Sequence, residues 1–323
     1  MLKLKHLYPN FDLAKEALTS WAHDKENLDE VLARFRISGN AIYPFYWDGA
    51  ICFLRLAPTD EKLRDNIAGE IEFILYLREN GYPAAEPLLS LSGEHLLTLE
   101  TAWGDYFATA FRGVSGVRID KSDYSEDILF AYGKALGKLR ELSSRFVPRV
   151  AKWSHEDALH WIGSILEEYR APASVLTELN TLRTDLSFLS KSNATYGLVH
   201  YDFEPDNVFF DADGGICNVI DFDDGMYHWY ALDIEQAFGE FRDTLSPADA
   251  KRAEETFLRG YREEFELTSE VSATLPLMRR FVDLFRYARI IRSVAEVFEN
   301  EPEWMTGLRE FLGTMVRGYE EGL

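Results

Sequence analysis

The spacing of hydrophobic and polar residues divides the chain into a first third with the pattern of strands and a remainder with the pattern of helices. Short apolar runs bounded by Gly, Asn and Asp predict strands, whereas apolar residues three and four positions apart predict amphipathic helices. After a short predicted helix at 11–22, strands are expected at 31–37, 41–47, 51–56, 95–101 and 105–111. One helix is expected between these strands, at 60–79, because Asn80-Gly81 follows its apolar positions and is typical of a helix end.

The remainder of the chain has long stretches of helical periodicity and one interruption. Helices are expected at 124–146, 155–169, 172–190, 229–244, 247–265 and from about 275 to 320. The interruption at 196–222 has the pattern of a strand, a polar loop, and two strands joined by a turn at Asp213-Gly214. We therefore predict an α+β fold with a small β-rich lobe at 1–111, a hinge at 112–116 and a larger, mostly helical lobe at 117–323.

The length and charge of the chain restrict its partners. At 323 residues it is long enough for two lobes, and 55 acidic against 34 basic residues give a net charge of −21. Such a chain repels nucleic acid and anionic membrane surfaces, and it can attract a cationic partner. Its two cysteines, Cys52 and Cys217, are too few for a disulfide framework, and no secretory signal is apparent. A cytoplasmic protein is therefore expected.

The segment that interrupts the helices is rich in carboxylates and an amide, among them Asp202, Asn207 and Asp221. No Lys or Arg occurs from Ser192 to Phe241, so these acids repel one another unless they are solvated or neutralised by cations. Asp and Asn oxygens are ligands that suit Mg²⁺. A hairpin after Asn207 would bring the first loop close to Asp221. One carboxylate could then accept a hydroxyl proton while the other groups hold metal ions against phosphates.

The spacing of these residues matches a known pattern. His200-Tyr201-Asp202-x-x-x-x-Asn207, followed by Ile220-Asp221-Phe222-Asp223, resembles the catalytic and metal-binding loops of aminoglycoside phosphotransferase-like kinases. That family includes choline kinases and a class of homoserine kinases, and it shares its fold with protein kinases. The resemblance implies a protein-kinase-like two-lobed fold and transfer of the γ-phosphate of ATP to a hydroxyl of a small molecule. It further implies that Asp202 is the catalytic base or orients the acceptor, and that Asn207 and Asp221 are Mg²⁺ ligands.

Neighbouring polar residues of the segment have supporting roles or none in this interpretation. His200 is expected to hold the loop through hydrogen bonds. Asp233 resembles an aspartate that follows the metal loop in this family, and it is expected to cap or pin the loop. Glu204, Asp206 and Asp224 are expected to be solvated acids.

The kinase resemblance also predicts a cation on the third strand and an acid on the helix that follows. Arg55, at the end of the strand 51–56, and Glu70, on the predicted helix, occupy these positions. Arg55 stands where lysine is usual, and its planar guanidinium can still clamp phosphate oxygens. The loop Ser38-Gly39-Asn40 contains one glycine, so a glycine-rich phosphate loop is weakly represented.

Several alternatives stay open at this level. The acceptor could be aminoglycoside-like or polyamine-like, as the acidic charge allows, or homoserine, choline, a sugar or another metabolite. A pseudokinase that binds nucleotide without turnover is a second class, favoured by Arg55 and the sparse loop and opposed by the intact Asp202, Asn207 and Asp221. A protein kinase is disfavoured because no Ala-Pro-Glu follows Asp221.

Overall fold

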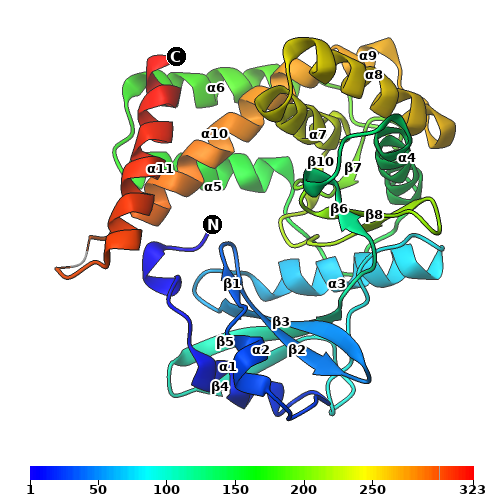
Figure 1. Ribbon diagram of the computed structural model, residues 1–323. Coiled ribbons are helices and arrows are strands. Elements are labelled where there is room, and N and C mark those ends of the chain that lie inside the picture. The colour runs from blue at the N-terminus through cyan, green and yellow to red at the C-terminus, as the bar shows by residue number, and fades with distance from the viewer. Residues whose placement is uncertain (298) are drawn as a thin grey trace.

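The computed structural model describes residues 1–297 and 299–323, which form two lobes (Figure 1). The smaller lobe is built on a five-stranded antiparallel sheet, and the larger lobe consists mostly of helices. In Figure 1 the sheet lobe lies at the bottom and the helical lobe lies at the top, with α3 (Arg64–Glu79) running between them. This is the predicted α+β, kinase-like architecture with its small β-rich lobe and its larger helical lobe.

The sheet lobe has the strand order β1-β2-β3-β5-β4. Its strands are β1 (Arg36–Ile37), β2 (Ala41–Trp47), β3 (Ala50–Pro58), β4 (Leu97–Thr101) and β5 (Gly104–Arg112). The short helices α1 (Phe11–Leu18) and α2 (Leu28–Leu32) pack on the sheet face that carries Leu54 and Leu56. Since side chains alternate along a strand, Arg55 lies on the opposite face, where it meets α3.

The helical lobe contains short strands among its helices. Its helices are α4 (Glu126–Ser143), α5 (His155–Glu168), α6 (Ala173–Ser187), α7 (Ala231–Thr244), α8 (Pro247–Glu264), α9 (Ser269–Ser272), α10 (Leu275–Val294) and α11 (Glu303–Glu321). Its strands are β6 (Val117–Arg118), β7 (Tyr196–Val199), β8 (Val208–Asp211), β9 (Ile216–Val219) and β10 (Met226–Trp229). The strands form two small antiparallel sheets, β6-β8-β9 and β10-β7. Within the described ranges, no helix combines the length and the apolar character that crossing a bilayer requires.

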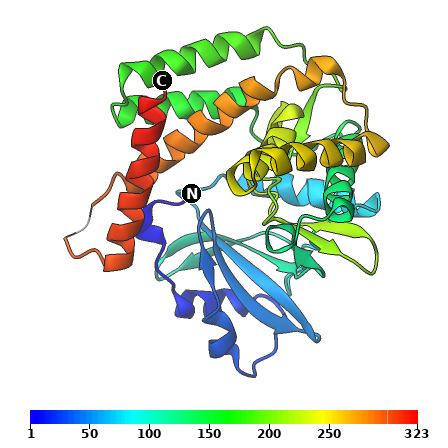
Figure 2. The same ribbon diagram turned by 45° about the horizontal axis from the view of Figure 1, so that its top comes forward.

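Two features join the lobes. Phe73, Ile74 and Leu77 of α3 belong to the same hydrophobic cluster as Leu136 and Phe222 of the helical lobe, so the lobes share a core. The N-terminal segment also leaves the sheet lobe and runs beside α11 in both views (Figures 1 and 2). There the carbonyl of Leu2 accepts a hydrogen bond from Ser293 Oγ at 2.7 Å.

The structure differs from the sequence-based prediction at several short elements. The strand expected at 31–37 is in fact the helix α2 followed by the two-residue strand β1, because Val31 and Leu32 are buried as adjacent residues of one helical turn. Strand β10 was not predicted, and it takes the first residue of the helix expected at 229–244. The helices expected from about 275 to 320 are confirmed as α10 and α11, and Pro302 precedes α11. The hairpin turn at Asp213-Gly214 is confirmed by the pairing of Asp211 with Ile216.

Close packing of α4 on α8 gives a prediction about stability. A Cβ atom on Gly133 of α4 would overlap the carbonyl oxygen of Phe257 on α8, whereas a Cβ on Gly239 of α7 would meet nothing within 4 Å. Gly133→Ala should therefore lower the free energy of unfolding by about 2 kcal/mol or more, since the helix backbones must separate. Gly239→Ala should leave it unchanged or raise it by up to about 1 kcal/mol. Urea unfolding of both variants checks this, and equal stability of the two would contradict the packing argument.

Candidate active site

The loop between β7 and β8 has an unusual backbone that is held from α7. Tyr201 adopts a φ of +71°, which residues other than glycine rarely adopt. The carboxylate of Asp233, at the start of α7, accepts hydrogen bonds from the backbone N–H groups of His200 at 2.9 Å and Tyr201 at 2.7 Å. Gln236, one turn further along α7, donates to the carbonyl of Tyr201. These bonds fix the loop, and the pinning role predicted for Asp233 is confirmed.

His200 connects this loop to the segment that carries Asp221. Its Nε2 lies 2.9 Å from the carbonyl oxygen of Ile220, and its ring is fully buried. Burial lowers the pKa of His200 to about 4, so the ring is neutral at pH 7 and Nε2 is the donor in this bond. The loop-supporting role predicted for His200 is therefore confirmed.

Asp202, Asn207 and Asp221 lie together where β7, β8 and β9 end or begin. The amide of Asn207 donates to the carboxylate of Asp202 at 3.1 Å and to its backbone carbonyl at 3.0 Å. The carbonyl of Asn207 accepts a hydrogen bond from the N–H of Ile220, which directly precedes Asp221. The hairpin of β8 and β9 thus brings the two loops together, as the sequence predicts.

The electrostatics of these acids favour an added cation. Burial and the neighbouring carboxylates, chiefly Asp224, raise the pKa of Asp202 to about 6. Burial, with Asp223 and Asp202, raises the pKa of Asp221 well above its usual range. Neither carboxylate forms an ion pair with a basic side chain among the described residues. A divalent cation between them would remove this penalty, and the available donors are the oxygen ligands that Mg²⁺ prefers.

Arg55 and Glu70 form the predicted ion pair between β3 and α3. The two terminal nitrogens of Arg55 donate to the two carboxylate oxygens of Glu70 at 2.8 and 2.5 Å, and its Nε donates to Thr109 Oγ1 at 3.2 Å. Arg55 and Glu70 are 5% and 1% exposed. The bidentate geometry requires arginine, so lysine would not replace it at this position.

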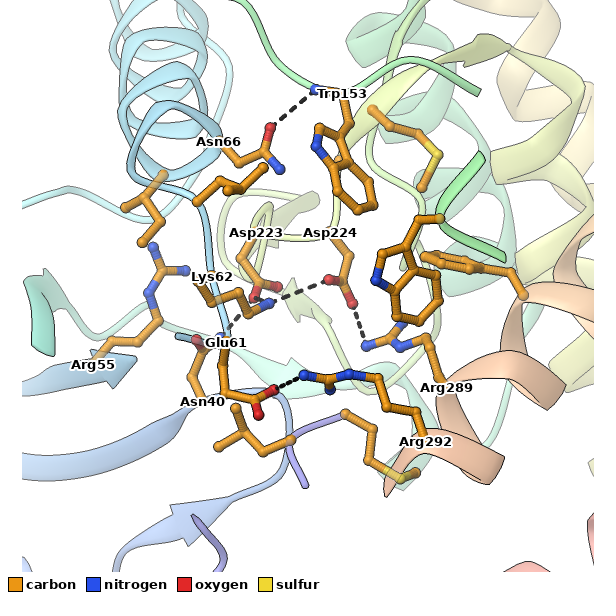
Figure 3. Close-up of a pocket in the computed structure, with 18 residues that line it drawn as sticks. Asn40, Arg55, Glu61, Lys62, Asn66, Trp153, Asp223, Asp224, Arg289 and Arg292 are labelled. Atoms are coloured by element: carbon orange, nitrogen blue, oxygen red, sulfur yellow. Dashed lines mark hydrogen bonds and ion pairs between the residues drawn. The ribbon is translucent and has the colours of Figure 1, made fainter. Parts of the chain in front are cut away.

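Asp223 and Asp224 meet basic partners that the sequence did not reveal. Lys62, in the loop before α3, lies 2.7 Å from the Asp223 carboxylate and 3.4 Å from that of Asp224, and Arg289 of α10 lies 2.7 Å from Asp224. Figure 3 shows Lys62 between the two acids, with Asn40 beside Asp223. Although burial opposes ionisation, Arg289 and Lys62 lower the pKa of Asp224 to about 2. The expectation that Asp224 is a solvated acid is therefore wrong.

Glu204 also differs from the expected solvated acid. Burial and the nearby charges of Asp202 and Asp206 raise its pKa to about 8. Its carboxylate has no hydrogen bond or ion pair within the described part of the chain. Asp206 is half-buried, and its carboxylate lies 3.7 Å from Arg36.

A further cation, Lys152, binds the backbone of the segment Asp221–Asp224, and it was also not predicted. Its buried ammonium donates to the carbonyl oxygens of Asn66 at 3.2 Å, Asp223 at 3.3 Å and Phe222 at 3.5 Å. Burial lowers the pKa of Lys152 to about 8. Because Asn66 belongs to α3, this side chain ties the Asp221–Asp224 segment to the sheet lobe.

Two cavities meet at Asp221. The first, here called the connector cavity, has a volume of about 320 Å³ and includes the connector residues Gly113 and Val114. Its apolar walls come from both lobes and include Ile42, Phe53, Phe111, Phe209 and Ile220. The second, the α10–α11 cavity, has a volume of about 490 Å³ and contains Asp202, Glu204, Gln236 and Arg286. Asn207 lines the first cavity, Asp202 lines the second, and Asp221 lines both.

Comparisons with known proteins identify the family of this chain. Residues 40–268 match the family model of APH, the phosphotransferase enzyme family. Amicoumacin kinase of Bacillus subtilis (strain 168) is 26% identical over 324 residues, which cover 92% of this chain and 95% of the relative.

Two solved structures share the fold over nearly their whole lengths. An amicoumacin kinase in complex with AMP-PNP, Ca²⁺ and Ami has a TM-score of 0.77 at 22% identity, covering 97% of this chain and 94% of that one. A microcompartment-associated aminopropanol kinase has a TM-score of 0.67 at 20% identity, covering 96% of this chain and 97% of that one. Since the family model spans most of the chain and includes every residue from the β1–β2 loop to the end of α8, this protein belongs to the APH family of small-molecule phosphotransferases.

Proposed function

We propose that this protein transfers the γ-phosphate of ATP to a hydroxyl group of a small, cationic acceptor with the help of Mg²⁺. The observation that carries the proposal is the position of Asp221, which lines both cavities between Asn207 on one side and Asp202 on the other. A nucleotide in the connector cavity and an acceptor in the α10–α11 cavity would meet there. Phosphoryl transfer depends mainly on such positioning and on neutralising charge.

Each residue has a role in this proposal. Asn207 and Asp221 would hold Mg²⁺, which when bound supplies positive charge to the phosphate oxygens. Asp202 orients the acceptor hydroxyl and takes its proton as the oxygen bonds to phosphorus and the bond to the departing ADP oxygen breaks. Arg55, held rigid by Glu70, directs its remaining N–H donors at the nucleotide phosphates.

The lobes and the location of the protein are part of the proposal. Residues 1–111 form the nucleotide lobe, 112–116 the hinge, and 117–323 the catalytic and acceptor lobe. The N–H of Gly113 donates to Ile51 of β3 at 2.8 Å, and Gly116 has a φ of +105°, which lets the chain turn between lobes. Cys52 and Cys217 are both free and buried, which suits a cytoplasmic protein.

The acceptor cavity supports a cationic and partly apolar molecule. Asp202 and Glu204 face it without a basic ion-pair partner in the described chain, and Arg286 only partly offsets their charge. Val282, Ile290, Leu308 and Phe311, from α10 and α11, provide an apolar wall. An amino alcohol could place its ammonium group at Glu204 and its hydroxyl at Asp202. The ammonium charge would favour the ionised form of Glu204, whose pKa is raised to about 8 in the free protein.

Removing the carboxylate of Asp202 should abolish turnover without unfolding the protein. Asp202→Asn keeps the hydrogen bond to Asn207 but cannot take a proton, so kcat should fall by a factor of about 10² to 10⁴. ADP release measures the rate, and circular dichroism checks the fold. Asp213→Asn, in the exposed hairpin turn, is the charge-matched control and should retain full activity. Near-normal turnover by Asp202→Asn would refute the assigned role.

Nucleotide binding should depend on the divalent cation through Asp221. Mg²⁺ and ATP together should stabilise the wild type by about 2.7 kcal/mol when the nucleotide is at about 100 times its dissociation constant. Asp221→Ala should lose this gain, and so should the wild type with EDTA. A thermal-shift series measures it. Stabilisation by ATP that needs no metal, together with no ADP release, would favour the pseudokinase alternative instead.

Glu204 should set the preference for a charged acceptor. Glu204→Gln should raise the KM for an amino alcohol about tenfold, because a charge-assisted hydrogen bond is lost. The KM for the diol of equal length should change little. Glu255→Gln, on the exposed face of α8, is the matched control. An equal loss for both acceptors would argue against recognition of an ammonium group.

A further inference from the structure

The turn between β1 and β2 contributes only Ser38 to the lining of the connector cavity, while Gly39 and Asn40 line the α10–α11 cavity. In kinase-like folds a glycine-rich loop covers the phosphates with its backbone, but here the β1–β2 turn is Ser38-Gly39-Asn40. The N–H of Ser38 already donates to the carbonyl of Asn40 at 3.0 Å. The side chain of Asn40 turns away from the cavity and donates to Asp223 at 2.6 Å (Figure 3). A polyphosphate would therefore find little cradle in this loop.

Arginines, unexpectedly dense for so acidic a chain, line the same cavity. Besides Arg55, the cavity is lined by Arg34, Arg36, Arg112 and Arg118. Two of these have firm partners. Arg118 donates to both carboxylate oxygens of Asp120 at 2.8 and 2.5 Å, and Arg112 donates to Glu86 at 3.2 Å while lying over the ring of Trp47. Arg55 is likewise neutralised by Glu70.

Arg36 is differently placed. Its side chain is 63% exposed, and among the described residues its ionic contact is Asp206, at 3.7 Å, which also lines the cavity. Such an exposed pair contributes little and exchanges partners at low cost. Asp206 directly precedes Asn207, so the guanidinium of Arg36 lies above the loop that begins at Asp202. In the proposed function, the γ-phosphate of a bound nucleotide would lie at this end of the cavity.

We propose that Arg36 binds the polyphosphate of the nucleotide and supplies the contact that a glycine-rich loop would otherwise make. The inference rests on the proposed function, in which a nucleotide occupies the connector cavity. On binding, the guanidinium leaves Asp206 and forms paired hydrogen bonds with phosphate oxygens, for which its planar fork is suited. It also adds a positive charge to the cavity that Asp221 lines, in which the charge of Arg55 is neutralised by Glu70.

Equilibrium binding of adenosine, ADP and ATP, measured calorimetrically with Mg²⁺ and without acceptor, tests the proposal. Arg36→Gln should weaken the binding of ADP and of ATP about tenfold, the factor that corresponds to about 1.4 kcal/mol. The affinity for adenosine should stay within about twofold of the wild-type value. Arg145→Gln, in the turn after α4, is the control, because Arg145 is 58% exposed and also has a carboxylate partner, Glu141. It should change none of the three affinities. Equal weakening of adenosine and ATP by Arg36→Gln, or no change in either, would overturn the proposal.

The competition with Asp206 gives a second test. Asp206→Asn should strengthen ADP binding, because Arg36 no longer has to leave a carboxylate, and the gain should vanish in the double variant with Arg36→Gln. If Asp206→Asn instead weakens the binding of ADP both in the wild type and in the Arg36→Gln variant, Arg36 does not act through the phosphates. A wild-type protein that binds neither ADP nor ATP would refute the proposed function itself. Unchanged nucleotide affinity in Arg36→Gln would refute only the role of Arg36.

Discussion

Repulsion among buried carboxylates is the constraint on which the active-site region depends. Asp202, Asp221, Asp223 and Asp224 are close enough to shift one another's pKa, and the low dielectric of the interior strengthens that repulsion. The fold supplies basic partners for two of these four carboxylates. Lys62 and Arg289 pair with Asp223 and Asp224, which stay ionised, whereas Asp202 and Asp221 have no such partner in the described chain. The site is thus divided into two acids with basic partners and two acids whose charge is not compensated by a basic partner in the described chain.

The same neutralisation joins the lobes. Lys62 comes from the sheet lobe and Arg289 from the last part of the helical lobe, and both reach one short segment that follows β9. Lys152 adds bonds from that segment to Asn66 of α3. Separating the lobes would remove Lys62 from the buried carboxylate of Asp223, which is costly, whereas Asp224 would keep its partner Arg289 in the same lobe. The ionic network and the core shared through α3 act in the same direction.

The sequence could predict the parts of this site that are local. Asp202, Asn207 and Asp221 are close in the chain, and a hairpin is enough to bring them together. Arg55 and Glu70 are 15 residues apart, on a strand and the helix that follows it. Lys62 and Arg289 could not be found in this way, because they lie 161 and 65 residues from the acids they contact. The absence of Lys and Arg near these acids correctly excluded local partners and said nothing about distant ones.

Short elements escaped prediction for a related reason. Strand β10 has four residues, and its existence depends on pairing with β7, 27 residues earlier at the closest pair, Met226 and Val199. Its aromatic residues continue directly into α7, so periodicity alone assigns its last residue to the helix. The helix α2 is one turn long, too short for a helical period to stand out from a β-like run. In each case the deciding contacts are tertiary.

The arrangement of the two cavities implies that their occupants affect one another. The turn at Ser38-Gly39-Asn40 belongs to the α10–α11 cavity, and Ser38 and Asp221 also line the connector cavity. Asn40 donates a hydrogen bond to Asp223, so this bond joins the turn of the sheet lobe to the segment Asp221–Asp224 of the helical lobe. A molecule in the connector cavity that shifts this turn necessarily reshapes the other cavity. By linkage, an occupant of the α10–α11 cavity must then change the affinity of the connector cavity by the same factor. Ser38 and Asp221, which line both cavities, are the residues through which such coupling would act.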